Sequence, residues 1–241
     1  MPKCKKNKGV EKRQTYLISP TSPFNVTEAF RNLKASICVS LPKKPNGEGV
    51  VITFTSPNAS EGKTTVAVNL AVMLSLSNAK VVLIDADIRK GRIEKFFDLP
   101  VTPGLSDYLS GQATKEDVVR TQSENLSFIA RGVHSPRPYE LLESEVMKEL
   151  LNDLKKEYDY VIIDTPPMPA ISDALAVATK SDGTVVVCRH RNSNVNEIAK
   201  TLNTLSFANA KVLGVVVNDY KMEQLGKYGN YYRYYESEGN V

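Results

Sequence analysis

The stretch Val50–Val66, VVITFTSPNASEGKTTV, joins a run of apolar and β-branched residues to a polar loop that ends in Gly-Lys-Thr-Thr. The run Val50–Thr55 predicts a strand that is buried on both faces, and the apolar residues after the loop predict a helix. In such a strand–loop–helix unit, backbone N–H groups of the loop and the helix N-terminus point at one place and bind phosphate there. The stretch therefore predicts a nucleotide-binding loop of the P-loop type.

The loop keeps the end of the common pattern G-x-x-x-x-G-K-[ST] but not its start, because Pro57 stands where the first glycine belongs. We expect Lys63 to reach the β- and γ-phosphates of ATP and the Thr64 hydroxyl to bind Mg²⁺. The expected ATP-binding residues of the loop are Ala59, Ser60, Glu61, Gly62, Lys63, Thr64 and Thr65. A chance Gly-Lys-Thr in a surface loop is the alternative, and the flanking strand and helix disfavour it.

Residue 58 bears on the class of P-loop protein. One large group of P-loop ATPases, which includes the partition and division-site ATPases, reads K-G-G-x-G-K-T and carries a signature lysine early in the loop. That lysine would fall at position 58, where this chain has Asn58. The sequence therefore disfavours that group.

Further apolar runs follow along the chain, with helical stretches between them. Strands are expected at residues 50–55, 81–84, 126–130, 161–164, 184–188 and 212–217, and helices at 64–77 and 141–157. A helical pattern also begins at Thr27, a good N-cap residue. The alternation predicts an α/β protein with the P-loop NTPase fold, in which helices flank both faces of a mostly parallel central sheet.

Acidic residues stand at the ends of two of these strands. Asp85 and Asp87 follow the second strand, and Asp164 ends the strand in YDYVIIDTPP. Ligands of open α/β sheets bind at the carboxyl ends of the strands, so we expect these carboxylates in the site. One could take a proton from an attacking hydroxyl, and others could hold Mg²⁺. The alternative for Asp85 and Asp87 is a pair of polar residues that cap a loop.

Composition limits the possible partners and the compartment. The chain has 241 residues and a net charge of +4, which does not suggest a nucleic-acid partner. Three scattered cysteines, no leader and no apolar run of membrane-spanning length lead us to expect a cytoplasmic protein. Residues 1–26 are expected to form a flexible basic arm that is either simply solvated or attracted to an anionic membrane. Residues 27–219 form the predicted P-loop domain, and residues 220–241 a flexible, Tyr-rich tail.

Together these motifs resemble the bacterial tyrosine kinases of capsule and exopolysaccharide synthesis. The loop SPNASEGKTT is similar to their Walker A motif, VVLIDADIR to their second motif, called Walker A′, and VIIDTPP to their Walker B motif. The segments SPFNVTEAFRNLKASI and PRPYELLESEVMKELL and the C-terminal Tyr cluster also match. The chain departs from the family at Ala59-Ser60, where Pro-Gly is common. Ser60 would be strained if the loop requires a positive φ there.

The resemblance implies an ATP- and Mg²⁺-dependent protein-tyrosine kinase. Lys63, Asp85, Asp87 and Asp164 would be catalytic, with Asp85 as the base, and Thr64, Asp87 and Asp164 would bind the metal. The acceptors, phosphorylated in trans within an oligomer, would be Tyr228, Tyr231, Tyr232, Tyr234 and Tyr235. The E-x-x-R-x-x-R motif for ring assembly appears as Glu28, Arg31 and Lys34, and lysine lacks the bidentate fork of arginine. Asn218 would contact adenine or cap a loop.

The resemblance is to the stand-alone cytoplasmic type of this family. It implies a separate membrane adaptor of the polysaccharide co-polymerase type that recruits the kinase to the inner face of the membrane and activates it. A phosphotyrosine phosphatase would be a further partner. Two rival functions stay open: an ATPase switch of the partition or division-site class without kinase activity, and a non-enzymatic scaffold. Asn58 and the Tyr cluster disfavour the first, and the complete set of Lys63 and aspartates disfavours the second.

Overall fold

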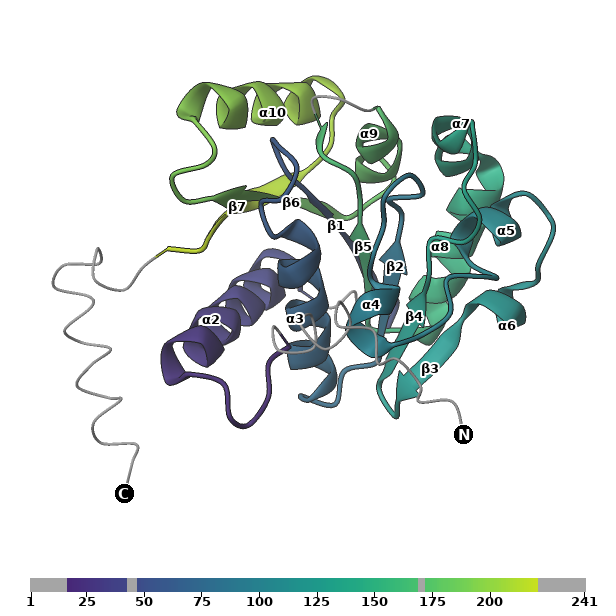
Figure 1. Ribbon diagram of the computed structural model, residues 1–241, viewed down its shortest axis with the longest axis horizontal. Helices are drawn as coiled ribbons and strands as arrows, with labels where there is room; N and C mark the ends of the chain where they lie inside the picture. The colour runs from purple at the N-terminus through teal and green to yellow at the C-terminus, as the bar shows by residue number, and fades with distance from the viewer. Residues whose placement is uncertain (1–16, 43–46, 169–171, 221–241) are drawn as a thin grey trace, which may run out of the picture.

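The structure is a computed structural model that describes residues 17–42, 47–168 and 172–220 (Figure 1). Its seven-stranded sheet has the order β3-β4-β2-β5-β1-β6-β7. Every neighbouring pair is parallel except β3 and β4, which are antiparallel. The strands are β1 Val50–Thr55, β2 Val81–Asp85, β3 Arg120–Ser123, β4 Leu126–Ile129, β5 Tyr160–Asp164, β6 Gly183–Arg189 and β7 Val212–Asn218. The expected α/β fold with a mostly parallel sheet is confirmed.

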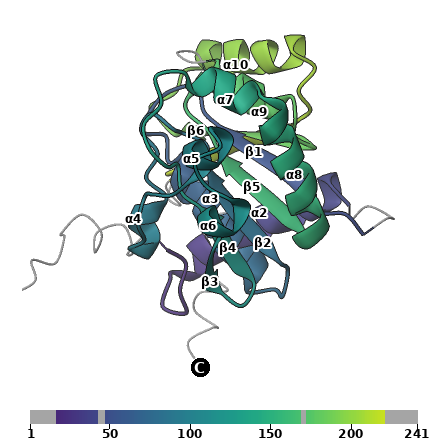
Figure 2. The same cartoon turned by 90° about the vertical axis from the view of Figure 1, so that its right-hand side faces the viewer.

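Helices cover both faces of the sheet (Figures 1 and 2). One face packs against α2 and α3, and the other against α5, α7, α8 and α9. The last long helix, α10, shares a small apolar cluster with α9 and β6. The helices are α2 Phe24–Ser40, α3 Lys63–Ser75, α4 Glu94–Phe97, α5 Leu105–Leu109, α6 Lys115–Val118, α7 Pro138–Glu143, α8 Glu145–Glu157, α9 Asp173–Ala178 and α10 Val195–Phe207.

Strand β1 shows why the central strands lack alternation between apolar and polar residues. Val50, Ile52 and Phe54 point into the cluster on the α3 side, and Val51 points into the cluster on the α8 side. Both sets are almost completely buried, so both faces require apolar residues. The buried strand places the P-loop at the carboxyl edge of the sheet, between the neighbouring strands β5 and β6.

The structure corrects three predicted elements. Strand β3 was not predicted, because its sequence RTQS is polar and its residues are mostly exposed at the edge of the sheet. The helix predicted over residues 141–157 is two helices, separated at Ser144, whose hydroxyl accepts a hydrogen bond from the Met147 N–H at 3.2 Å and caps α8. The helix predicted to begin at Thr27 begins at Phe24, and the Thr27 hydroxyl donates to the Pro23 carbonyl in the first turn.

The segment before α2 is folded onto the domain in its described part. Leu17 packs against the core cluster of the α3 side, and the Ile18 N–H donates to Asn69 Oδ1 at 2.7 Å. Residues 1–16 of the predicted arm and residues 221–241 of the predicted tail lie outside the described residues. Among the helices in the described ranges, none has the length and apolar character needed to cross a membrane.

Candidate active site

The P-loop connects β1 to α3 and requires a positive φ at two positions. Ser60 has φ 64° and Gly62 has φ 85°. A Cβ at Gly62 would lie 1.9 Å from Asn218 Nδ2, so only glycine fits there. A positive φ is strained for Ser60, because serine has a Cβ, and glycine at this position would avoid the strain. This is the strain expected from the sequence if the loop requires a positive φ at residue 60.

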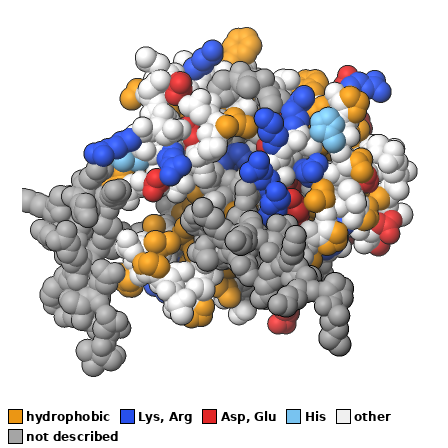
Figure 3. All heavy atoms as spheres, viewed as in Figure 1, with side chains coloured by type: hydrophobic (Ala, Val, Ile, Leu, Met, Phe, Trp, Pro, Cys, Tyr) orange, Lys and Arg blue, Asp and Glu red, His pale blue; other side chains and the backbone are white. Residues whose placement is uncertain are grey.

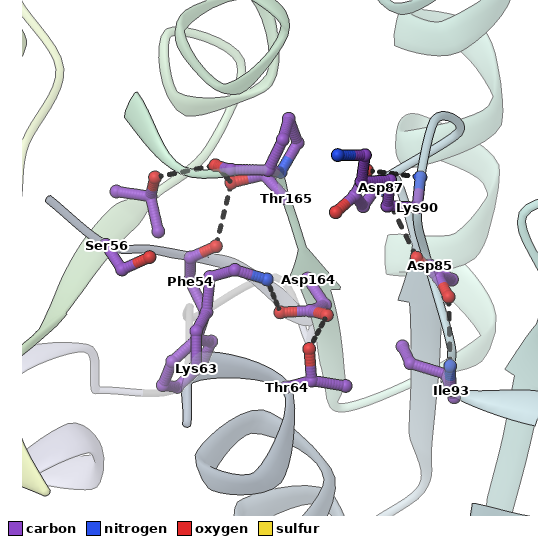
Figure 4. Close-up of polar contacts among 12 residues, drawn as sticks. Phe54, Ser56, Lys63, Thr64, Asp85, Asp87, Lys90, Ile93, Asp164 and Thr165 are labelled. Atoms are coloured by element: carbon purple, nitrogen blue, oxygen red, sulfur yellow. Dashed lines mark hydrogen bonds and ion pairs between the residues drawn. The ribbon is translucent and has the colours of Figure 1, made fainter. Parts of the chain in front are cut away.

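Lys63 and Thr64 both bind the carboxylate of Asp164 (Figure 4). Lys63 Nζ lies 2.5 Å from Asp164 Oδ1, and the Thr64 hydroxyl donates to Oδ2 at 2.6 Å. Strands β1 and β5 are neighbours in the sheet, and the side chain of Asp164 is only 1% exposed. Burial raises the pKa of Asp164, while Lys63 and the hydrogen bonds lower it. The lysine of the Walker A motif is thus paired with the aspartate of the Walker B motif.

Asp85 lies directly beside Asp164, because the two residues are paired in the register of β2 and β5. It is completely buried, and its two oxygens accept the N–H groups of Asp87 at 3.2 Å and Ile93 at 3.0 Å. Gly91 lies so close that a Cβ there would be 2.2 Å from Asp85 Oδ1. Asp85 therefore anchors the turn that follows β2. Burial, followed by the charge of Asp164, raises the pKa of Asp85 well above its usual range.

A cavity of about 530 Å³ opens above these residues. Asp87 and the P-loop line it, together with three basic side chains, Lys90, Arg92 and Arg189. Figure 3 shows that Lys and Arg side chains gather in the middle of this face, above α4. Of the two aspartates after β2, Asp87 thus lines the cavity, and Asp85 lies buried beneath it. A cavity lined by the P-loop and by basic side chains suits a polyanion such as a nucleoside triphosphate.

Side chains far along the chain fix the outer wall of the P-loop. Asn58 Nδ2 donates to Glu197 Oε2 at 2.8 Å, and the Ser193 hydroxyl donates to Glu61 Oε1. The Asn218 amide donates to the Glu61 carbonyl at 2.9 Å. Asn218 thus contacts the backbone of the P-loop, and its expected contact with adenine stays a prediction. Ser193 and Glu197 were not predicted, because no local pattern links the start of α10 to a loop more than 130 residues earlier.

A second contact that the sequence did not suggest joins the turn after β2 to α9. Arg89 Nε lies 2.8 Å from Asp173 Oδ2, and the Asp173 side chain is 2% exposed. Asp173 raises the pKa of the Arg89 guanidinium through this hydrogen bond. The other Asp173 oxygen is buried and has no partner within the described part of the chain. This ion pair holds the segment that carries Asp87.

The predicted assembly residues lie on α2, away from the cavity. Arg31 is paired with Glu28 one turn earlier, and Lys34 Nζ donates to Ser77 Oγ at 2.8 Å. The predicted acceptor tyrosines, residues 228 to 235, lie outside the described residues. The assembly residues therefore do not line the cavity, and the structure does not describe where the acceptor tyrosines lie.

The donor set of the site fits Mg²⁺ better than a tightly chelated metal. Thr64, Asp87 and Asp164 offer oxygen atoms only, which Mg²⁺ prefers. Over the described ranges, no group of three or more His, Cys, Asp or Glu is arranged to hold a metal by itself.

Comparisons with known proteins agree with this geometry. A family model described as "AAA domain" matches residues 49–215. "Tyrosine-protein kinase YwqD" of Bacillus subtilis (strain 168) is 34% identical over 229 residues, which are 94% of this chain and 95% of that protein. "Tyrosine-protein kinase ptk" of Acinetobacter johnsonii is 36% identical over 83% of this chain. A "putative tyrosine-protein kinase in cps region" of Klebsiella pneumoniae is 35% identical over 92% of it.

The chain belongs to the bacterial tyrosine kinase family. It spans only 27% and 31% of the length of the Acinetobacter and Klebsiella relatives, respectively. The solved kinase domain of the Escherichia coli tyrosine kinase ETK matches with a TM-score of 0.76 and 30% identity, over 86% of this chain and 83% of that one. The cell division ATPase MinD of Pyrococcus furiosus matches with a TM-score of 0.62 and 26% identity, over 71% and 73%. The P-loop NTPase fold is therefore shared beyond the kinases.

Proposed function

We propose that this member of the bacterial tyrosine kinase family transfers the γ-phosphoryl group of ATP to tyrosine hydroxyls, first those of its own C-terminal cluster. The observation that carries the proposal is the junction of Lys63, Thr64 and Asp164 beneath a cavity that Asp87 also lines. Phosphoryl transfer requires positioning and charge stabilisation more than covalent chemistry, and these residues supply both.

Each residue has a role that follows from its place. Lys63 leaves Asp164 to contact the β- and γ-phosphates, and Thr64, Asp87 and Asp164 hold Mg²⁺. Mg²⁺ held by these residues would supply positive charge next to the phosphate oxygens. The tyrosine oxygen bonds to the γ-phosphorus, the bond to the β–γ bridging oxygen breaks, and ADP leaves. The hydroxyl proton passes to the carboxylate pair Asp85 and Asp87. Of this pair, Asp87 lines the cavity, and Asp85 lies buried with both oxygens accepting backbone N–H groups.

Assembly and partners extend the proposal. The acceptors are Tyr228, Tyr231, Tyr232, Tyr234 and Tyr235, presented in trans within a ring that forms through Glu28, Arg31 and Lys34. The kinase controls capsular or exopolysaccharide synthesis, which the name of the Klebsiella relative supports. A membrane adaptor of the polysaccharide co-polymerase type recruits it to the inner face of the cell membrane and activates it, and a phosphotyrosine phosphatase resets it.

The second candidate is an ATPase switch of the partition and division-site class, which the likeness to MinD supports. The proposed kinase is favoured over it by position 58. A signature lysine there would serve nucleotide chemistry, whereas the Asn58 amide is bonded to Glu197 of the same chain. Because the Asn58 side chain is uncharged and bonded to Glu197, position 58 offers no positive charge to a phosphate group.

Intact-mass spectrometry of the full chain with and without Mg-ATP tests the proposal. It is done alone and with a fused cytoplasmic tail from an adjacent membrane protein. We expect stepwise gains of about 80 Da per phosphate. The gains should map to the five acceptor tyrosines and vanish in Lys63→Met and in a variant with all five changed to Phe. ATP hydrolysis without any mass gain, even with the fused activator, would instead support the ATPase switch.

A further inference from the structure

Basic side chains outnumber acidic ones in the lining of the cavity above the P-loop, where the acidic residues are Asp87 and Glu61. Four basic side chains line it: Lys63, Lys90, Arg92 and Arg189. Lys63 is paired with Asp164, and Arg189 is paired with Asp219 at 2.8 Å. Lys90 and Arg92 are exposed and have no carboxylate partner among the residues that the structure describes. Their charges are therefore available to a ligand of the cavity.

The turn that carries these two residues is held rigidly at its base. It begins at Asp87, whose carboxylate accepts the Lys90 N–H at 2.9 Å, and it ends at Ile93, whose N–H donates to Asp85. Gly91, between the two basic residues, is pressed against the Asp85 carboxylate. Lys90 and Arg92 are thus presented to the cavity by the same contacts that position Asp87.

The position of the turn indicates which part of the ligand it meets. Figure 4 shows Asp87 and Lys90 across the site from Lys63 and Thr64. The P-loop side binds the α- and β-phosphates through backbone N–H groups. A group on the opposite wall meets the end of the phosphate chain, where three equatorial oxygens gain charge during transfer.

We propose that Lys90 and Arg92 are catalytic residues that bind the γ-phosphoryl oxygens of the nucleotide as the phosphoryl group leaves ADP. The inference deepens the proposed function and rests on it for the identity of the acceptor. The turn after β2 would then both carry Asp87 and bind the γ-phosphoryl group through Lys90 and Arg92. The other anion that this wall suits is an acidic side chain next to the acceptor tyrosine, and the experiment separates the two.

The experiment measures nucleotide affinity in the full chain, so it does not depend on kinase activity. The variants are Lys90→Met, Arg92→Met and the double variant. Lys95→Met is the matched control, because Lys95 is an exposed lysine of the same segment that does not line the cavity. Mg-ADP and the Mg complex of an ATP analogue with an imido β–γ bridge are titrated by calorimetry. A third sample tests whether ADP with aluminium fluoride is trapped as a mimic of the transferring group.

We expect the double variant to lose about tenfold or more in affinity for the imido analogue, to keep its affinity for ADP within about twofold, and to trap no fluoride complex. Lys95→Met should match the parent protein in all three. Equal losses for ADP and the analogue, or no loss for either with a raised KM for an acidic tyrosine peptide, would overturn the inference. A parent protein that binds both nucleotides and phosphorylates no tyrosine would contradict the proposed function and leave this binding result intact.

Discussion

Lys63 Nζ lies 2.5 Å from Asp164 Oδ1, and both side chains are more than nine-tenths buried. The ion pair joins the P-loop to the end of β5. In the proposed mechanism, binding of Mg-ATP separates the two residues. A phosphate group then takes the place of Asp164 beside Lys63, and Mg²⁺ takes the place of Lys63 beside Asp164. Loss of either partner would leave a buried charge without its counter-charge, so the pair ties the P-loop to the end of β5.

Loss of Lys63 should cost stability as well as activity. Lys63→Met leaves the Asp164 carboxylate buried without its cation, so we expect the free energy of unfolding to fall by about 3–5 kcal/mol. The double variant Lys63→Met/Asp164→Asn should recover part of this loss, because no buried charge remains. Urea unfolding followed by circular dichroism measures both. If the double variant is no more stable than Lys63→Met, the ion pair does not account for the loss.

Replacement of Ser60 by glycine should stabilise the chain. The φ of 64° at Ser60 is strained for a residue with a Cβ and free of strain for glycine. After the greater chain entropy of glycine in the unfolded state is subtracted, we expect Ser60→Gly to add about 0.5–1 kcal/mol. Ser60→Ala is the control, since alanine keeps the strain and should change stability little. A stabilised Ser60→Ala would show that the hydroxyl, and not φ, is the cause.

Gly91 should tolerate no side chain. A Cβ there would come within 2.2 Å of Asp85 Oδ1, and the buried aspartate has no room to move away. Gly91→Ala should therefore lower the free energy of unfolding by about 1–3 kcal/mol. Gly214→Ala is the matched control, because no atom lies within 4 Å of its added Cβ. Chemical denaturation of the two variants side by side tests this, and equal behaviour would be evidence against the close packing.

Asp85 should make stability depend on pH in one direction. Its pKa is raised in the folded state, chiefly by burial, so the folded protein keeps a proton that the unfolded chain releases above about pH 3.9. The parent protein should therefore lose stability relative to Asp85→Asn as the pH rises from the unfolded pKa to the folded one. Urea unfolding of both proteins between about pH 4 and 8 measures the difference. A difference that is constant, or that changes in favour of the parent, would contradict the raised pKa.

Lys34, the third residue of the predicted assembly motif, should limit how readily the proposed ring forms. Lys34 is a point charge that bonds Ser77 of its own chain, whereas arginine could engage a carboxylate of a neighbouring copy with two parallel hydrogen bonds. We expect Lys34→Arg to shift the oligomer to larger size at equal protein concentration, and Arg31→Ala to shift it to smaller size. Light scattering after size exclusion measures both. Identical masses for all three proteins would separate this motif from assembly.

Local sequence was sufficient for most of the sheet and for the P-loop. Buried strands require apolar residues on both faces, so Val50–Thr55 and the runs like it are recognisable one at a time. The spacing of Gly62, Lys63 and Thr64 is also local, because one loop and one helix turn contain the whole motif. The same reasoning fails for β3, whose polar edge sequence carries no burial signal, and for Ser144, a helix cap inside an apparently continuous helical stretch.

The sequence by itself determined the fold class, the family, the nucleotide loop and the identity of the aspartates. Only the tertiary structure decided which of them meet. Asp85 and Asp164 are 79 positions apart along the printed chain and adjacent because the strand order places β2 beside β5. The same order buries Asp85 as an anchor, exposes Asp87 to the cavity, and brings Glu197 to Asn58 and Asp173 to Arg89. Strand order results from the packing of the whole sheet, and no local run of residues encodes it.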